Sequence, residues 1–211
     1  GKLRIGLVSA NIGSGSPASW SLGWVRNFDR SDFDVSVINL GLEEDADSYR
    51  FKDAADHYWH LQGDPLDVAK HIRSLDLDYL IYPDLGDGGW TLRFAIFRLA
   101  RRQAAAWGCP FTSGLPTIDD YLSSELMEPD EAETHYTENL VRLPHTGLTY
   151  EKHPTGMRHL TRASLGLPEG HLVLMGLYLA KWMPSRDEMI RRISERSANP
   201  IALIAFGGPD R

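Results

Sequence analysis

The chain has 211 residues and a formal net charge of −7, with 42% hydrophobic and 24% charged residues. This apolar fraction is too high for a disordered chain and indicates a packed core. The 29 Asp and Glu residues outnumber the 22 Lys and Arg residues, which argues against a non-specific nucleic-acid binder. The sequence contains no apolar run near the roughly 20 residues that span a bilayer, so we expect neither nucleic acid nor a membrane as a partner.

The single cysteine, Cys109, cannot form an internal disulfide, which excludes an oxidised scaffold and favours a reducing compartment. The sequence has no signal-peptide pattern, and we expect a cytoplasmic protein. The chain begins at Gly1 directly before a strand-like run and stops at Arg211 shortly after another. We therefore expect it to be a fragment of a longer protein.

Strands and helices are predicted to alternate along the first 143 residues. Apolar and β-branched runs indicate strands, and apolar residues at helical spacing indicate helices. The predicted strands are 3–8, 34–40, 57–61, 77–82, 103–107, 121–123 and 139–143, and the predicted helices are 18–28, 66–75, 91–102 and 129–135. The acidic stretch 43–47 is predicted to be a solvated surface loop.

A second cycle follows a connector at 150–156. It comprises a helix at 158–165, a strand at 171–176, a helix at 185–197 and a strand at 201–206. Alternating strands and helices predict an α/β fold with a mostly parallel sheet and helices on both faces. We expect a Rossmann-like domain over 1–150 and the beginning of a second, truncated one over 151–211.

A glycine-containing turn, Gly13-x-Gly15, lies between the first predicted strand and the first predicted helix. Backbone amides in such a turn can bind a phosphate group. A dinucleotide fingerprint would need a third glycine where Ala18 stands and an acidic residue where Leu40 stands. The sequence therefore disfavours a dinucleotide-dependent oxidoreductase, and we interpret the segment as a strand-to-helix turn that lines a cleft.

The stretch Trp107-Gly-Cys-Pro-Phe-Thr-Ser-Gly-Leu-Pro-Thr-Ile-Asp119 holds two glycines, two prolines and three hydroxyl side chains. Such a loop can present backbone N–H groups and hydroxyls together. Because loops at the carboxyl ends of parallel strands face the ligand crevice, it is a candidate binding loop. The alternative is a structured connector packed under the sheet.

Two further motifs follow this loop, Tyr121-Leu-Ser-Ser-Glu-Leu-Met-Glu-Pro129 and His135-Tyr-Thr-Glu-Asn-Leu-Val-Arg-Leu-Pro144. With the loop, they resemble the catalytic region of the O-GlcNAc-transferase-like glycosyltransferases, glycosyltransferase family 41. The opening Leu3-Arg-Ile-Gly-Leu-Val-Ser9 and the strand end Leu80-Ile-Tyr-Pro-Asp84 also resemble it. The resemblance covers most of the chain, is dense from 104 to 147, and is most similar to bacterial members of the SPINDLY and adhesin N-glucosyltransferase type.

This resemblance implies a GT-B architecture, in which two Rossmann-like domains face each other across a cleft. It implies a UDP-sugar donor, UDP-GlcNAc or another UDP-hexose, and a protein side chain as acceptor, without a metal ion or other cofactor. Residues 1–150 would form the acceptor-side domain, and 151–211 the beginning of the nucleotide-sugar-binding domain. The fragment alone is expected to be inactive.

The family's Thr-Ser-Gly loop borders the donor sugar and the acceptor. The match implies binding roles for Thr112, Ser113 and Gly114, and we extend these roles to Leu115 and Pro116.

The turn Gly13-Ser14-Gly15-Ser16 is assigned to the same site. The family also places a lysine shortly after the first strand of its second domain, which matches Lys181 in Tyr178-Leu-Ala-Lys-Trp-Met-Pro184. A fixed cation there can stabilise the charge that develops on the leaving diphosphate where no metal does so. Lys181 is therefore the predicted catalytic residue, and Tyr178 is assigned to binding.

Two positions depart from the family pattern. Family members usually carry a histidine in the loop after the first strand, where Gly15 or Ser16 stands here. They also tend to have glutamine three residues before the lysine, where Tyr178 stands. These departures favour, as the alternative, a non-catalytic binding or scaffolding module derived from such an enzyme.

Several other residues are candidates by type, but structural roles fit them better. His57 and His60 have a spacing that suggests a metal pair, yet we predict half-buried strand histidines. Cys109 has no neighbouring histidine and is predicted to be a small buried residue. Trp20 and Trp24, at helical spacing, are predicted to belong to the core rather than to a sugar-binding platform. Three loop aspartates can hold an acceptor hydroxyl or act as a base, although such residues more often cap turns: Asp84, Asp87 and Asp119.

Overall fold

The structure is a computed structural model that describes residues 1–13, 16–86, 89–150, 161–178 and 183–206. The chain divides into two compact units, Gly1–Lys152 and His153–Arg211. The first is an α/β unit with a central sheet, and the second is a small β-α-β unit.

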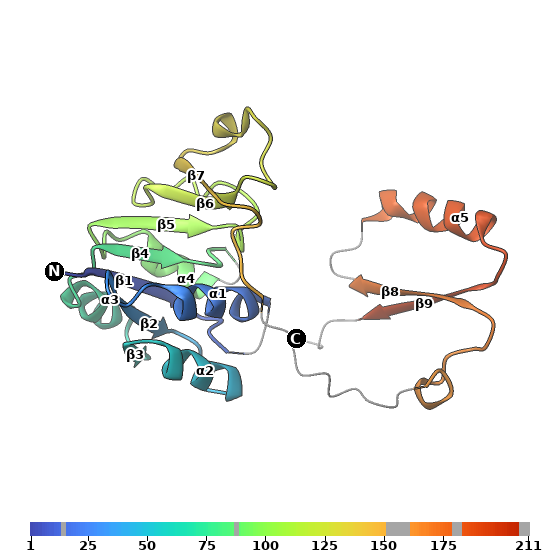
Figure 1. Ribbon diagram of the computed structural model, residues 1–211, viewed down its shortest axis with the longest axis horizontal. Coiled ribbons are helices and arrows are strands. Elements are labelled where there is room, and N and C mark those ends of the chain that lie inside the picture. Colours follow the sequence, from blue (N-terminus) through green and yellow to red (C-terminus); the bar gives the residue numbers. More distant parts are fainter. Residues whose placement is uncertain (14–15, 87–88, 151–160, 179–182, 207–211) are drawn as a thin grey trace. The chain divides into compact units, whose positions relative to one another are not determined.

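A seven-stranded parallel sheet forms the centre of the first unit (Figure 1). Its strands are β1 (Leu3–Ser9), β2 (Phe33–Asn39), β3 (His57–His60), β4 (Tyr79–Tyr82), β5 (Arg102–Ala106), β6 (Asp120–Ser124) and β7 (Asn139–Leu143). Their order is β3-β2-β1-β4-β5-β6-β7, so the direction of winding reverses between β1 and β4. The prediction of a Rossmann-like parallel sheet is confirmed.

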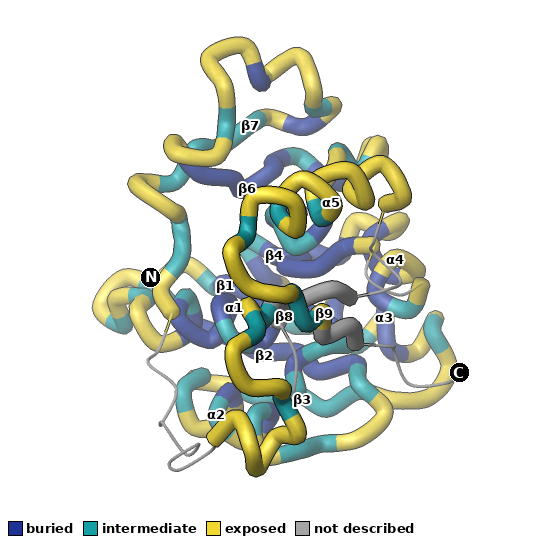
Figure 2. The backbone as a smooth tube through the Cα atoms, turned by 90° about the vertical axis from the view of Figure 1, so that its right-hand side faces the viewer, coloured by how far each residue is buried: buried dark blue, intermediate teal, exposed yellow. Residues whose placement is uncertain are grey.

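Helices cover both faces of this sheet. Neighbouring residues of a strand point to opposite faces, so each strand contributes to two apolar layers. On β1, Leu7 belongs to the apolar cluster that includes α1 (Ser16–Asn27) and α2 (Ala46–Ala54). Val8, the next residue, belongs to the cluster that includes α3 (Pro65–Ser74) and α4 (Gly89–Ala95). The inner strands of the sheet are largely buried (Figure 2), whereas the edge strands β3 and β7 hold no buried residue.

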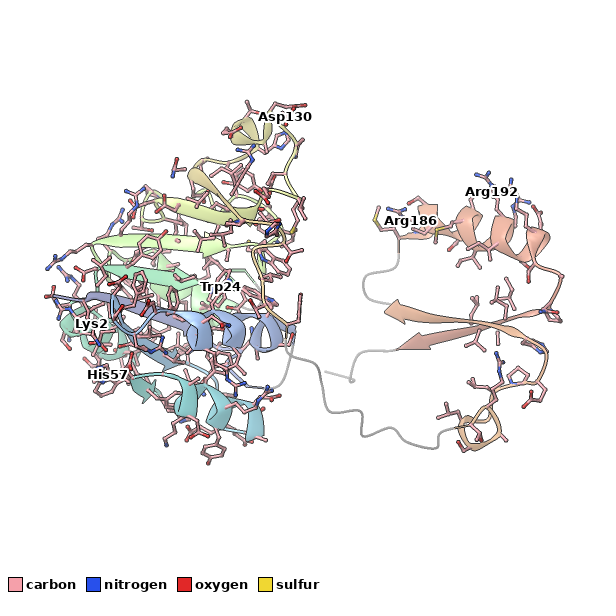
Figure 3. All side chains as sticks on the ribbon, viewed as in Figure 1. Lys2, Trp24, His57, Asp130, Arg186 and Arg192 are labelled. Carbon is pink, nitrogen blue, oxygen red and sulfur yellow. The ribbon has the colours of Figure 1, made fainter. Side chains whose placement is uncertain are left out.

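The aromatic residues of α1 belong to the core, as predicted from their spacing. Trp20 is 1% exposed and stacks on Trp107, with 4.8 Å between the ring centroids. Trp24, labelled in Figure 3, packs edge-on against Trp20 and donates a hydrogen bond of 2.8 Å from Nε1 to the Gly147 carbonyl. Trp20 is therefore closed to a sugar ring, and Trp24, which is half-buried, packs against the core.

The predicted solvated loop over 43–47 is too long, because its last two residues are the first two residues of α2. The Asp45 side chain caps the helix by accepting hydrogen bonds from the N–H groups of Asp47 and Ser48. In return, the Ser48 hydroxyl accepts a hydrogen bond from the Asp45 N–H. This reciprocal pair is a capping box with Asp and Ser in place of the commoner Ser and Glu.

Helix α4 ends at Ala95, so the predicted helix over 91–102 is too long. The side chain of Gln103, which is fully buried, provides the reason. Its Oε1 accepts hydrogen bonds from the N–H groups of Leu99 and Ala100, and its Nε2 donates to the Phe97 carbonyl. These backbone N–H and C=O groups thus find hydrogen-bond partners without a continuation of the helix.

The second unit holds two parallel strands, β8 (Leu172–Tyr178) and β9 (Ile201–Phe206), and the helix α5 (Asp187–Arg196). Short 3₁₀ helices lie at Ala163–Leu165 (η2) and Pro184–Arg186 (η4), and in the first unit at Ala132–His135 (η1). The predicted helix over 158–165 is thus reduced, in its described part, to η2. None of the ten described residues of α5 is buried; Figure 3 labels Arg186 of η4 and Arg192 of α5. Among the helices that the structure describes, none is long and apolar enough to cross a membrane.

Candidate functional site

The carboxyl ends of the seven parallel strands lie along one edge of the sheet (Figure 1). In open α/β sheets, ligands bind outside this edge where the strand order reverses. Here the reversal lies between β1 and β4. The loops that leave β1, β4 and the neighbouring β5 therefore form the candidate site.

A buried carboxylate joins the first two loops. Asp84, at the carboxyl end of β4, is 0% exposed. Its Oδ2 accepts hydrogen bonds from Ser9 Oγ at 2.7 Å and from Asn11 Nδ2 at 2.5 Å. The Thr91 hydroxyl accepts a hydrogen bond from the Ala10 N–H at 3.1 Å. From the sequence, Asp84 could bind an acceptor hydroxyl, act as a base or cap a turn. The structure shows its carboxylate inside this hydrogen-bonded cluster.

Close backbone packing joins the loops of β4 and β5. A Cβ on Gly108 would lie 2.3 Å from the Pro83 carbonyl oxygen, so only glycine fits there. A Cβ on Gly86 would lie 3.3 Å from the Cys109 sulfur. Burial raises the pKa of the Cys109 thiol, which makes the thiolate scarce at neutral pH. The prediction of Cys109 as a small buried residue is confirmed.

The Thr-Ser-Gly part of the next loop contacts a different carboxylate, that of Glu138, which directly precedes β7. Thr112 Oγ1 donates to Glu138 Oε2 at 2.6 Å. The Ser113 N–H donates to Glu138 Oε1 at 2.8 Å, and the Ser113 hydroxyl donates to the same oxygen. The hydroxyls predicted to bind donor sugar are thus engaged with the protein itself.

The residues that follow differ in exposure. Gly114 is exposed and has a φ of +65°, a left-handed conformation that favours glycine. Leu115 is half-buried, and its N–H donates to the Ser113 hydroxyl at 3.2 Å. Pro116 is exposed, and its carbonyl accepts a hydrogen bond from the Arg98 guanidinium. Among described residues, no hydrogen bond links these residues to the Asp84 cluster.

The turn after β1 is described in part. A Cβ on Gly13 would lie 2.6 Å from Asp45 Oδ2, so this glycine packs against the N-terminal cap of α2. Ser14 and Gly15 lie outside the described residues, and Ser16 is the first residue of α1. The structure therefore gives Gly13 a packing role beside the site, and its predicted role in ligand binding stays a prediction.

Two predicted site residues belong to the second unit. Tyr178 is the last residue of β8, and Lys181 lies outside the described residues. Their assignment to the nucleotide-sugar site stays a prediction.

Asp119 does not belong to the candidate site. It directly precedes β6, at the opposite edge of the sheet from the carboxyl ends of the strands. Its carboxylate pairs with Arg98 and accepts a hydrogen bond of 2.8 Å from the Gln103 N–H. Asp87, the remaining loop aspartate, lies outside the described residues.

Both histidines are residues of β3, as predicted, and do not converge; His60 is half-buried, but the prediction of a half-buried His57 is wrong, because its side chain is 52% exposed at the start of an edge strand. His57, at the start of the strand in Figure 3, contacts the Asp34 carboxylate at 3.1 Å. A ring nitrogen of His60 lies 2.7 Å from the Gly41 carbonyl. Residues three apart in a strand point to opposite faces, so this pair cannot share a metal ion. Within the described part of the chain, no three His, Cys, Asp or Glu side chains are grouped as metal ligands.

Glu138 is the residue in contact with the Thr112–Gly114 segment that the sequence reasoning missed. Because it directly precedes β7, it lies, like Asp119, at the amino ends of the strands and reaches the loop from that side. It is 7% exposed, although glutamates are rarely buried. Its only signal in the sequence is its place in the motif His135-Tyr-Thr-Glu138, 25 residues away from Ser113. A contact at that separation depends on the tertiary structure and leaves no local pattern.

Sequence comparisons identify relatives for most of the chain, although no family model matches it. A rice protein (Oryza sativa subsp. japonica), named probable UDP-N-acetylglucosamine–peptide N-acetylglucosaminyltransferase SPINDLY, is 31% identical over 157 residues. The protein of the same name from Arabidopsis thaliana is 27% identical over 157 residues. Each match covers 72% of this chain and 17% of the relative, so this chain corresponds to a small part of these proteins.

Among solved structures, a lysine-to-methionine mutant of the Thermobaculum terrenum O-GlcNAc transferase has a similar fold. The TM-score is 0.69 at 20% sequence identity, and the match covers 99% of this chain and 45% of that one. This likeness confirms the fold class. The sequence matches confirm the resemblance carried by the motifs: over the region that they cover, the chain belongs with the O-GlcNAc-transferase-like glycosyltransferases of family 41.

Proposed function

We propose that the full-length protein transfers GlcNAc, or another hexose, from a UDP-sugar to a side chain of an acceptor protein, without a metal ion and in the cytoplasm. The observation that carries the proposal is the position of the family motif Trp107–Asp119. This motif forms the loop that leaves the carboxyl end of β5, next to the reversal of strand order between β1 and β4. The names of the relatives support the reaction and its partners, a nucleotide sugar and a peptide.

The reaction breaks the bond between the sugar C1 and the diphosphate oxygen and forms a bond from C1 to the acceptor atom. The acceptor gives up its proton to water, and negative charge develops on the departing UDP. The segment Thr112–Gly114 is proposed to position donor sugar and acceptor. Lys181 is proposed to stabilise the diphosphate, since a fixed cation lowers the energy of this charge in the transition state.

The test is UDP release by the full-length protein, supplied with UDP-GlcNAc or UDP-glucose and acceptor peptides. Lys181→Ala is expected to lower turnover at least about tenfold, which corresponds to roughly 1.4 kcal/mol of barrier. Lys70→Ala is the matched control, because Lys70 is an exposed lysine on α3 whose ammonium pairs with Asp67. Unchanged turnover in Lys181→Ala would remove this lysine from the mechanism.

The alternative is a binding module, which the missing loop histidine and Tyr178 favour. Such a module would bind the nucleotide sugar or the acceptor protein and release no UDP. Calorimetric binding of a UDP-sugar without any turnover in the wild-type protein would establish this alternative and exclude the transferase.

A further inference from the structure

A buried glutamate holds the binding loop through a dense set of hydrogen bonds. Glu138 accepts from the Thr112 hydroxyl, the Ser113 N–H and the Ser113 hydroxyl. Thr112 Oγ1 in turn accepts a hydrogen bond from the Thr137 N–H at 3.0 Å. The two segments, 112–113 and 137–138, are thus joined in both directions.

The charge of Glu138 strengthens this connection. Burial alone would raise the pKa of the Glu138 carboxyl, but the hydrogen bonds from Ser113 and Thr112 outweigh burial and lower the pKa below its ordinary value. The group is therefore a carboxylate at neutral pH. Hydrogen bonds to a charged acceptor are roughly twice as strong as those between neutral groups.

The arrangement also decides what the loop can offer to a ligand. The hydroxyls of Thr112 and Ser113 are turned toward Glu138, whose two oxygens both accept hydrogen bonds from the loop. Gly114 remains exposed, and apart from its two chain neighbours no described residue has an atom within 4 Å of where its Cβ would be. The part of the segment that is open to a bound molecule is therefore the backbone around Gly114.

We propose that Glu138 is a positioning residue that fixes the backbone of Thr112–Gly114 against the donor sugar. The inference rests on the transferase function proposed above. Glu138 does not take the proton of the acceptor, because its oxygens would first have to release the loop. Its effect on the reaction passes through the conformation of Gly114.

The experiment compares Glu138→Ala, Glu138→Gln and the control Glu131→Gln in the full-length protein. Glu131 is an exposed carboxylate seven residues earlier and does not cap η1 through its side chain. Steady-state UDP release gives kcat and KM per folded molecule, and thermal unfolding gives the Tm. Hydrogen exchange of the peptide 111–115 reports the Ser113 N–H, which the carboxylate protects in the wild type.

We expect Glu138→Ala to lower kcat at least tenfold, and to accelerate exchange of the peptide 111–115. Glu138→Gln, which retains one carbonyl oxygen and the side-chain shape, should recover part of both effects. Glu131→Gln should match the wild type. A purely structural role predicts a lower Tm with unchanged kcat per folded molecule, and that result would overturn the inference.

The exchange measurement separates this inference from the function on which it rests. If the wild-type protein turns over no UDP-sugar, the transferase proposal fails, and with it the catalytic effect assigned to Glu138. Suppose instead that the wild type turns over the UDP-sugar, but the peptide 111–115 exchanges equally fast in the wild type, Glu138→Gln and Glu138→Ala. The transferase proposal then stands, and the positioning role of Glu138 is wrong.

Discussion

The Ser9 hydroxyl donates a hydrogen bond of 2.7 Å to the carboxylate of Asp84, which joins the carboxyl ends of β1 and β4 where the strand order reverses. Both side chains are fully buried. Ser9 Oγ also accepts a hydrogen bond of 2.7 Å from the Asn11 N–H. One hydroxyl therefore fixes both the end of β4 and the beginning of the loop that leaves β1.

This relationship predicts a measurable coupling between the two side chains. Ser9→Ala leaves the Asp84 carboxylate and the Asn11 N–H each without one hydrogen bond in a buried place, so it should lower the free energy of unfolding by about 2 kcal/mol. Asp84→Asn should cost a similar amount. In the double variant the losses should not add, because both single changes act on the same bond: Ser9→Ala removes its donor, and Asp84→Asn replaces its charged acceptor by a neutral one.

Urea unfolding, followed by tryptophan fluorescence, measures these free energies, since Trp20 and Trp107 stack inside the first unit. Asp130→Asn, at an exposed position marked in Figure 3, is the control and should have no effect. Strict additivity of Ser9→Ala and Asp84→Asn would mean that the hydrogen bond contributes nothing to the folded state.

The fold was largely predictable because its signals are local. Each of the seven strands of the first unit was predicted from a short run of apolar or small residues, and the alternation with helices predicted their parallel pairing. The glycines and prolines of Trp107–Asp119 predicted a loop, and the structure places it directly after β5. Strand periodicity and turn composition depend on neighbours in sequence, so a single sequence contains them.

The errors arose where distant residues decide the local structure. Helix α4 ends early because Gln103 satisfies the backbone of 97–100, and no residue inside the helix signals this. Helix α2 did have a local signal, the pair Asp45 and Ser48, but its acidic surroundings also fit a solvated loop. Glu138 was missed because its contacts with the loop exist only after β6 and β7 pair.

Two glycines provide a prediction on backbone packing. In Gly108→Ala the new methyl group would lie 2.3 Å from the Pro83 carbonyl oxygen, and the β4 and β5 loops would have to separate. We expect a loss of about 2 kcal/mol or more in the free energy of unfolding, a range typical of overpacked cores. In Gly89→Ala, at the first residue of α4, the new Cβ meets no described atom within 4 Å beyond its chain neighbours and the backbone of its own helix, and the expected change is within about 0.5 kcal/mol.

Thermal unfolding of the two variants beside the wild type provides the comparison. Because both changes add one methyl group to a glycine, the difference between them isolates the packing at Gly108. Equal Tm values for Gly108→Ala and Gly89→Ala would show that the loops of β4 and β5 do not pack as closely as described.

The last prediction concerns pH and the network at the other edge of the sheet. Asp120 is 2% exposed, and its carboxylate accepts hydrogen bonds from Arg102 at 2.5 and 2.7 Å, from Tyr79 at 2.9 Å and from Asn139 at 3.0 Å. Burial alone would raise the pKa of Asp120, but the hydrogen bonds, with that from Arg102 foremost, lower it.

A carboxyl whose pKa is lower in the folded than in the unfolded chain stabilises the fold above the unfolded pKa of about 3.9. This contribution is lost as the pH falls through the folded pKa. Asp120→Asn should therefore be less stable than the wild type at pH 7, and the difference should narrow as the pH falls below about 4. Urea midpoints at pH 7, 5, 4 and 3 measure this difference in stability, with Asp130→Asn, at an exposed position, as the control. A difference for Asp120→Asn that does not change with pH would show that Asp120 has the same pKa in the folded and unfolded chain, and that the Arg102 contact does not favour its charged form.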